Sequence, residues 1–112
     1  MTLNQAIQRA DELRPNSLER EIKADWVREL EGQVAGFMGL PFEKVGDDAP
    51  LLMHAPFDNI YYLYLAAMID FAQQDSDLYY NDSVLFNASF DRAKTVHLRR
   101  NIPPDSGNWR VL

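Results

Sequence analysis

The sequence IYYLYLAAMIDFA, residues 60–72, decides the fold of this chain. It predicts a helix that is apolar almost all the way round, because Asp70 is its only charged residue. On a helical wheel Tyr64 lies on one side, whereas Tyr62 and Ile69 point to the opposite side. A surface helix of a small monomer has one polar face. We therefore expect this helix to be covered on both sides, by other copies of the chain or by a partner.

Length and charge limit the possible functions. The 112 residues suffice for one domain with a modest core, which we place at residues 1–100, and an apolar content of 46% excludes wholesale disorder. A net charge of −6 argues against binding to phosphate backbones. Residues 43–82 hold eight acids and one base, whereas residues 92–100 hold four bases and no acid. Copies could stack head to tail through these charges; alternatively, they form two solvated faces.

Cysteine is absent, which excludes disulfides, thiolate metal sites and a cysteine nucleophile and fits a reducing cytoplasm. The N-terminal sequence MTLNQAIQRADELR predicts an amphipathic helix rather than a signal peptide. The apolar stretch at residues 60–72 is too short to span a bilayer. We therefore expect no membrane partner.

Helical spacing of apolar residues predicts an all-α fold, with about four helices in a compact bundle. Thr2 and Gln5 form a capping box for the first helix, which Pro15 ends. Asn16 or Ser17 caps the second helix. Its predicted buried stripe consists of side chains three or four residues apart: Leu18, Ile22, Trp26, Leu30, Gln33 and Phe37.

The second half of the chain predicts two adjacent helices. The first of them covers residues 60–72, and the run from Gln73 to Ser76 closes it and caps the last helix. Basic residues in the final turns of the last helix complement the helix dipole. Prolines then stop it, which leaves residues 101–112 as an extended C-terminal tail. The last helix carries one wide stripe: Tyr79, Ser83, Phe86, Phe90, Ala93 and His97.

Residues 40–55 form a connection that is long for a compact domain, and Pro41, Gly46 and Pro50 forbid a continuous helix there. Its apolar side chains need a surface on which to lie. Two interpretations are open: an arm that contacts a neighbouring subunit, or a loop folded back on its own core. The side chains in question are Phe42, Val45, Leu51, Leu52 and Met53.

No pattern in the chain predicts a catalytic, cofactor-binding or metal site. His54 and His97 have no second ligand at a metal-binding spacing, so we expect packing or surface roles for both. Residues 75–86 resemble a calcium loop, but Tyr80 takes the glycine position and Phe86 the glutamate position. We expect a protein that is not an enzyme and needs no cofactor.

Asp70 is the notable polar residue, because its helix is otherwise apolar. A buried carboxylate needs a cation or several hydrogen bonds, or it takes up a proton. The candidate cations are Arg92, Lys94 or a residue of a neighbouring subunit. The alternative is a position at a rim, where water reaches the carboxylate.

Several runs resemble small proteins encoded in the structural regions of phages and prophages: TLNQAI at residues 2–7, WVRELEG at 26–32, PFDNIY at 56–61 and LFNASF at 85–90. In length and helical layout the chain is similar to the head-to-tail connector (adaptor) proteins of long-tailed bacteriophages. The resemblance implies an all-α subunit that joins a ring beneath the portal and links it to the tail. It also implies an acidic channel lining along which DNA slides without sticking.

The first hypothesis is therefore a non-enzymatic virion structural protein, a connector that joins portal and tail through a self-associating ring. Its partners would be other copies, the portal protein and tail-side connector proteins, with DNA only passing through. It would occupy the host cytoplasm during assembly and then the virion. The alternative is an acidic helical regulatory or inhibitor module that binds a basic protein. The predicted subunit or partner contacts are Leu52, Met53, Tyr62, Ile69 and, in the tail, Trp109.

Overall fold

The computed structural model describes residues 1–42 and 44–100, except for the side chain of residue 100. Four helices make up the fold: α1 (Leu3–Leu13), α2 (Arg20–Met38), α3 (Asn59–Ala72) and α4 (Ser76–Arg100). The described residues form no strand, so the predicted all-α fold of four helices is confirmed. The expected tail, residues 101–112, lies outside the described residues. None of the four helices is both long enough and apolar enough to cross a membrane.

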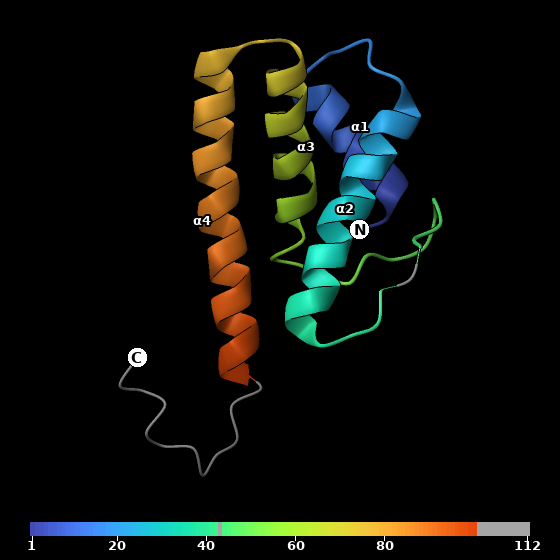
Figure 1. Ribbon diagram of the computed structural model, residues 1–112, viewed down its shortest axis with the longest axis vertical. Helices are drawn as coiled ribbons and strands as arrows, with labels where there is room; N and C mark the ends of the chain where they lie inside the picture. Colours follow the sequence, from blue (N-terminus) through green and yellow to red (C-terminus); the bar gives the residue numbers. More distant parts are fainter. Residues whose placement is uncertain (43, 101–112) are drawn as a thin grey trace.

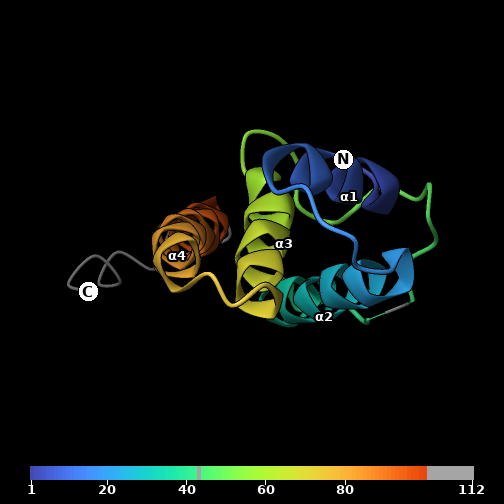
Figure 2. The same ribbon diagram turned by 90° about the horizontal axis from the view of Figure 1, so that it is seen from above.

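Helix α3 lies at the centre of the molecule. Seen from above, α1 and α2 pack on one side of it and α4 covers the other (Figure 2). Its buried side chains consequently point in several directions: Ile60, Tyr61, Leu65, Ala66, Ala67, Ile69 and Asp70. The chain's own three other helices therefore cover most of α3, where other copies or a partner were expected, and Phe71 near its end stays 63% exposed.

The first helix follows its sequence pattern. The hydroxyl oxygen of Thr2 accepts a hydrogen bond from the backbone N–H of Gln5 at 3.2 Å, and the Gln5 side chain accepts one from the Thr2 N–H at 2.9 Å. This capping box satisfies two of the N–H groups that a helix start leaves free. The predicted apolar stripe of α1 is buried: Leu3, Ala6, Ile7 and Ala10.

The buried face of α2 is rotated from the predicted one. Trp26 is only partly buried and Ile22 is 41% exposed, whereas the neighbouring positions enter the core. Both α1 and α3 pack against α2, so its buried face is set by two contact directions and not by the largest side chains. The helix ends at Gly39, whose φ of 70° is the left-handed conformation typical of a helix C-cap. The buried side chains of α2 are Lys23, Ala24, Val27, Leu30, Glu31, Val34 and Ala35.

The long connection between α2 and α3 divides into two parts. Leu51 and Met53 are buried, and the Leu51 N–H donates to the Met1 carbonyl at 2.9 Å. That part folds back on the chain's own core, which settles its two interpretations in favour of the second. Leu40 and Phe42, at the beginning of the connection, remain 46% and 52% exposed.

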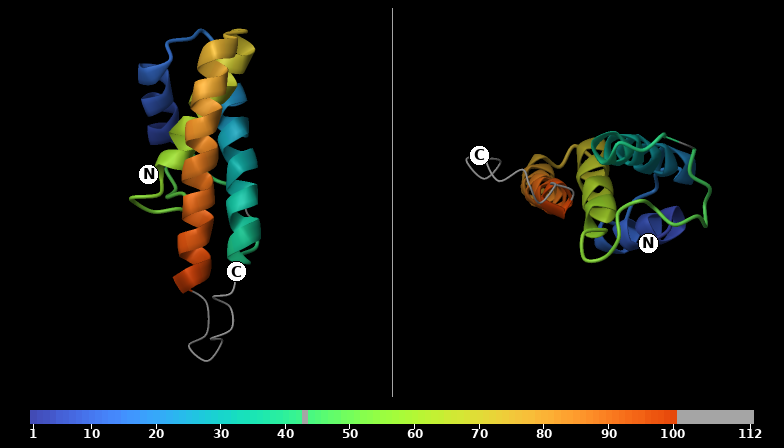
Figure 3. Two further views of the ribbon diagram at one scale, coloured as in Figure 1. Left: turned by 90° about the vertical axis from the view of Figure 1, so that its left-hand side faces the viewer. Right: turned by 90° about the horizontal axis from the view of Figure 1, so that it is seen from below.

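Helices α3 and α4 form an antiparallel hairpin (Figure 1). Asp75 caps α4, since its carboxylate accepts the Leu78 N–H at 3.1 Å. Helix α4 is longer than α3 and continues beside the end of α2 (Figure 3), where the Phe37 ring lies 5.7 Å from Phe90 and 5.6 Å from His97. The predicted stripe of α4 thus faces α3 and α2, with Ala93 fully buried and the phenylalanines partly buried.

The central position of α3 predicts the effect of shortening Ile69, which is fully buried. We expect Ile69→Ala to lower the free energy of unfolding by about 2–5 kcal/mol, because it leaves a cavity in the core. Urea denaturation followed by circular dichroism measures the change. The matched control is Val84→Ala on α4, which is 50% exposed and should change stability by no more than about 0.5 kcal/mol. Equal effects of both variants would contradict the central placement of α3.

Candidate functional site

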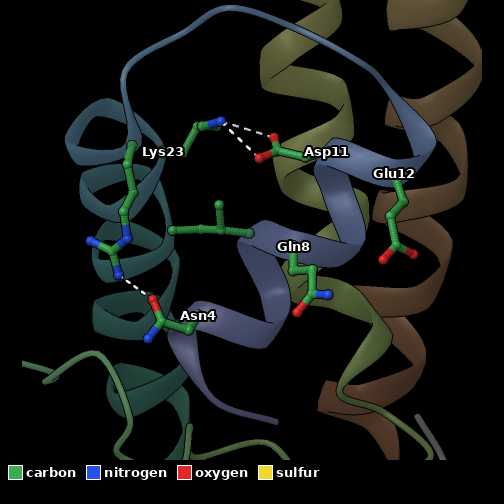
Figure 4. A pocket seen from close by; sticks show the side chains of 7 residues that line it. Asn4, Gln8, Asp11, Glu12 and Lys23 are labelled. Atoms are coloured by element: carbon green, nitrogen blue, oxygen red, sulfur yellow. Dashed lines mark hydrogen bonds and ion pairs between the residues drawn. The ribbon is translucent and has the colours of Figure 1, made fainter.

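The hollows of the described surface are shallow and open. The hollow in Figure 4, of about 490 Å³, lies between α1 and α2. Its polar groups bind one another: Lys23 Nζ donates to both Asp11 carboxylate oxygens at 2.9 and 3.0 Å, and Arg20 donates to Asn4. These pairs join two helices, and Glu12 also lines the hollow. Across residues 1–42 and 44–100, no three potential metal ligands come together.

A cluster of one cation and two carboxylates joins three helices. Arg14, at the end of α1, donates through Nε to Asp70 Oδ1 at 3.1 Å. Its Nη2 lies 2.9 Å from Asp82 Oδ2 on α4. Asp70 is fully buried, which contradicts the expected rim position, and its partner is none of the predicted candidates. The sequence offered no signal for this pairing, since Arg14 and Asp70 lie 56 positions apart.

The two carboxylates of this cluster share a single arginine. Burial and the adjacent Asp82 raise the pKa of Asp70 to about 7, against the opposing effect of Arg14. The second oxygen of Asp70, Oδ2, is buried and finds no donor among the described residues. A proton on Asp70 would let it donate to Asp82 and would relieve the repulsion between the two acids. The cluster is therefore sensitive to pH near neutrality.

A second buried network positions the folded-back part of the connection. The Tyr61 hydroxyl donates to Glu31 Oε1 at 2.6 Å and accepts the Met53 N–H at 3.0 Å. Glu31 Oε2 accepts the Leu52 N–H at 2.8 Å. Burial and the Glu31 carboxylate raise the pKa of Tyr61, so its hydroxyl keeps its proton. The network fixes residues 51–53 against α2 and α3, and the role of Glu31 was missed because a lone acid in a helix gives no pattern.

The residues predicted to contact another subunit or a partner differ in how exposed they are. Met53 and Ile69 are 5% and 0% exposed, so they belong to the subunit's own core and cannot present a surface to another copy. Leu52 and Tyr62 are partly buried, and Arg9 lies over the Tyr62 ring at 5.2 Å. Contacts through these two remain a prediction. Trp109 lies outside the described residues.

Helix α4 exposes apolar side chains on a face that the sequence pattern had not predicted to be exposed. Tyr80, Val84 and Leu98 are 69%, 50% and 57% exposed, and we call these three the α4 outer face. At about 100° per residue they fall within about 40° of one another, on the side of α4 away from the buried Asp82 and Ala93. A helical wheel of residues 76–100 could have found this face, because apolar residues occur on both sides of that helix. No described element covers it.

Comparison with protein-family models, with curated proteins and with solved structures finds no match to this chain. Inferences about function therefore start from the surfaces and clusters of the chain itself.

The raised pKa of Asp70 predicts that the free energy of unfolding depends on pH. The folded chain holds the Asp70 proton more tightly than the unfolded chain does, because the pKa of Asp70 is raised from 3.8 to about 7 on folding. Its contribution to stability is therefore complete below 3.8 and is lost as the pH rises through about 7. We expect Asp70→Asn to remove this loss, so that the variant gains stability relative to the wild type between about pH 5 and about pH 8.

Urea denaturation at several pH values measures this difference, and each unit of pKa shift corresponds to about 1.4 kcal/mol. Asp82→Asn should also flatten the dependence, because it removes the negative charge that raises the pKa of Asp70. Asp91→Asn is the matched control, since the Asp91 side chain is 75% exposed. Parallel pH curves for the wild type and Asp70→Asn would contradict a raised pKa.

The second network predicts the effect of removing one hydroxyl. Tyr61→Phe leaves Glu31 Oε1 and the Met53 N–H without a buried partner, so we expect a loss of about 1–3 kcal/mol in unfolding free energy. Amide exchange at Leu52 and Met53 should also become faster than in the wild type. Tyr62→Phe is the matched control, because it keeps the ring that Arg9 covers. If the two variants behave alike, the Tyr61 hydroxyl does not hold the connection in place.

Proposed function

We propose that the chain is a non-enzymatic virion structural protein, a head-to-tail connector that joins portal and tail through a self-associating ring. The observation that carries the proposal is the α4 outer face. A helix of 25 residues packs on one side only and leaves Tyr80, Val84 and Leu98 in water. Exposed apolar side chains along one face of a helix are typical of a surface that meets another protein.

The distribution of polar groups also favours an assembly role. The buried charges of Lys23 and Glu31 and the partly buried charge of Arg14 have partners that join helices to one another. A net charge of −6 fits a ring whose channel lets DNA pass without binding it. The resemblance of residues 2–90 to connector proteins agrees with such a ring.

A second candidate function is favoured by the exposed acids of α2. The side chains of Glu21 and Asp25 are 71% and 74% exposed. Carboxylates displayed in this way could bind a basic protein, as an acidic regulatory or inhibitor module does. Such a module would be a monomer or a dimer and would not bind a portal protein.

Native mass spectrometry tests the connector proposal. We expect the purified chain, alone or mixed with the portal protein encoded in the same genome, to form a closed ring of several subunits. The variants Val84→Asp and Leu98→Asp should reduce ring formation and keep the helix content, because both side chains are exposed.

The matched control is Leu13→Asp at the end of α1, an apolar residue that is 44% exposed and is not part of the α4 outer face. It should leave the ring intact. A monomer or dimer that does not bind the portal protein would contradict the connector proposal and favour the acidic module.

A further inference from the structure

We propose that the segment of this chain beyond α4, residues 101–112, binds back to the chain's own fold, with Trp109 seated in an apolar hollow between α2 and the connection that follows it. Trp109, expected from the sequence to contact another subunit or a partner, would then have its binding site in its own subunit. This inference goes beyond the proposed function and does not depend on the connector role.

The hollow is bordered by apolar side chains that the described residues leave in water. It has a volume of about 380 Å³, and its lining is mostly apolar, including Leu40, Phe42, Val45 and Leu52. Phe42 is 52% exposed and Leu40 is 46% exposed. An indole ring placed among these side chains would remove apolar surface from water on both partners.

The walls of this hollow are held in place without an occupant. The Leu52 N–H donates to the Glu31 carboxylate at 2.8 Å, and Arg28 Nε donates to the Val45 carbonyl at 3.3 Å. Both contacts tie the connection to α2. Binding of a side chain there would therefore require little ordering of the site, which favours affinity.

The end of α4 lies beside the end of α2, where the connection begins (Figure 3). The rings of Phe37 on α2 and His97 on α4 are 5.6 Å apart. Helix α2 gives way to the connection at Gly39, and α4 ends at Arg100, so both helices end shortly after this contact. The segment after α4 thus starts near the part of the chain that forms the hollow.

Residues 101–109 are long enough to reach the hollow. Ala35 lines it, and at about 100° per residue Ala35 and Phe37 point to nearly opposite sides of α2. The segment must therefore pass the end of a helix that is about 10–12 Å across with its side chains. An extended chain of this length spans up to about 30 Å, which is enough to bring Trp109 to the hollow.

The connection to α4 favours this segment over a second copy of the chain. A tethered group has an effective concentration of the order of millimolar, so a weak apolar contact suffices to keep the hollow occupied. The segment carries the apolar residues for such a contact: Trp109, Val111 and Leu112. Charge does not select the occupant, because Lys44 lines the hollow and Asp47 follows in the connection.

A spin label tests the proposal on the full chain, which contains no cysteine of its own. Asn108→Cys carries a nitroxide, and the label broadens the amide NMR signals of nearby residues in the ¹⁵N-labelled chain. We expect several-fold greater broadening at Leu40 and Val45 than at Glu12, which is exposed on α1. Adding Trp109→Ala should remove most of this excess, because the anchor is lost.

The matched pair of variants on the described surface is Phe42→Ala and Val84→Ala, whose parent side chains are 52% and 50% exposed. Phe42→Ala should reduce the broadening at Leu40 and Val45, and Val84→Ala should leave it unchanged. Circular dichroism checks that both variants keep the helix content of the wild type.

Three results would overturn the proposal. Broadening at Leu40 and Val45 that is the same with and without Trp109 would reflect the tether alone. Broadening centred on Leu98 and Val84 would place the segment on α4. A sample that mixes spin-labelled chain without ¹⁵N and ¹⁵N-labelled chain without the spin label detects contacts between copies, and the same excess there would make a second copy the occupant. None of these measurements needs a portal protein, so they leave the connector proposal to its own test.

Discussion

Burial of most of α3 between the other helices is the constraint on which the rest of the structure depends. The helix has one charged side chain in fourteen residues, so exposing any of its faces to water is unfavourable. Helices α1 and α2 cover one side, and α4 must cover the other. Residues 1–42 and 44–100 provide no further helix with which to cover the outside of α4. Helix α4 thus covers apolar surface of α3 but leaves its own outer face in water.

Polar pairs fix how these helices are placed. Hydrophobic burial is non-directional, so it does not by itself define the register between helices. Arg14 joins α1 to α3 and α4, and Lys23 joins α2 to α1. Glu31 and Tyr61 hold the returning part of the connection in place. A buried charge without its partner is costly, which makes other arrangements of the helices unfavourable. In the Asp70–Asp82 pair this arrangement leaves two like charges close together.

The same arrangement leaves apolar side chains in water on the outside of α4 and at the start of the α2–α3 connection. Exposed apolar side chains of this kind are typical of surfaces that meet other proteins. The proposed assembly role rests on them.

The sequence by itself determined that four helices form, the capping of α1 and α4 and the break at Pro15, because these depend on residues a few positions apart. It also marked Asp70 as exceptional. Only the tertiary structure decided that Arg14 pairs with Asp70, that Met53 and Ile69 are core residues and that Tyr80, Val84 and Leu98 are exposed. The sequence spacing of apolar residues shows which face of a helix avoids water, but not whether the same chain or another molecule covers that face. Only contacts between segments distant in the sequence decide this.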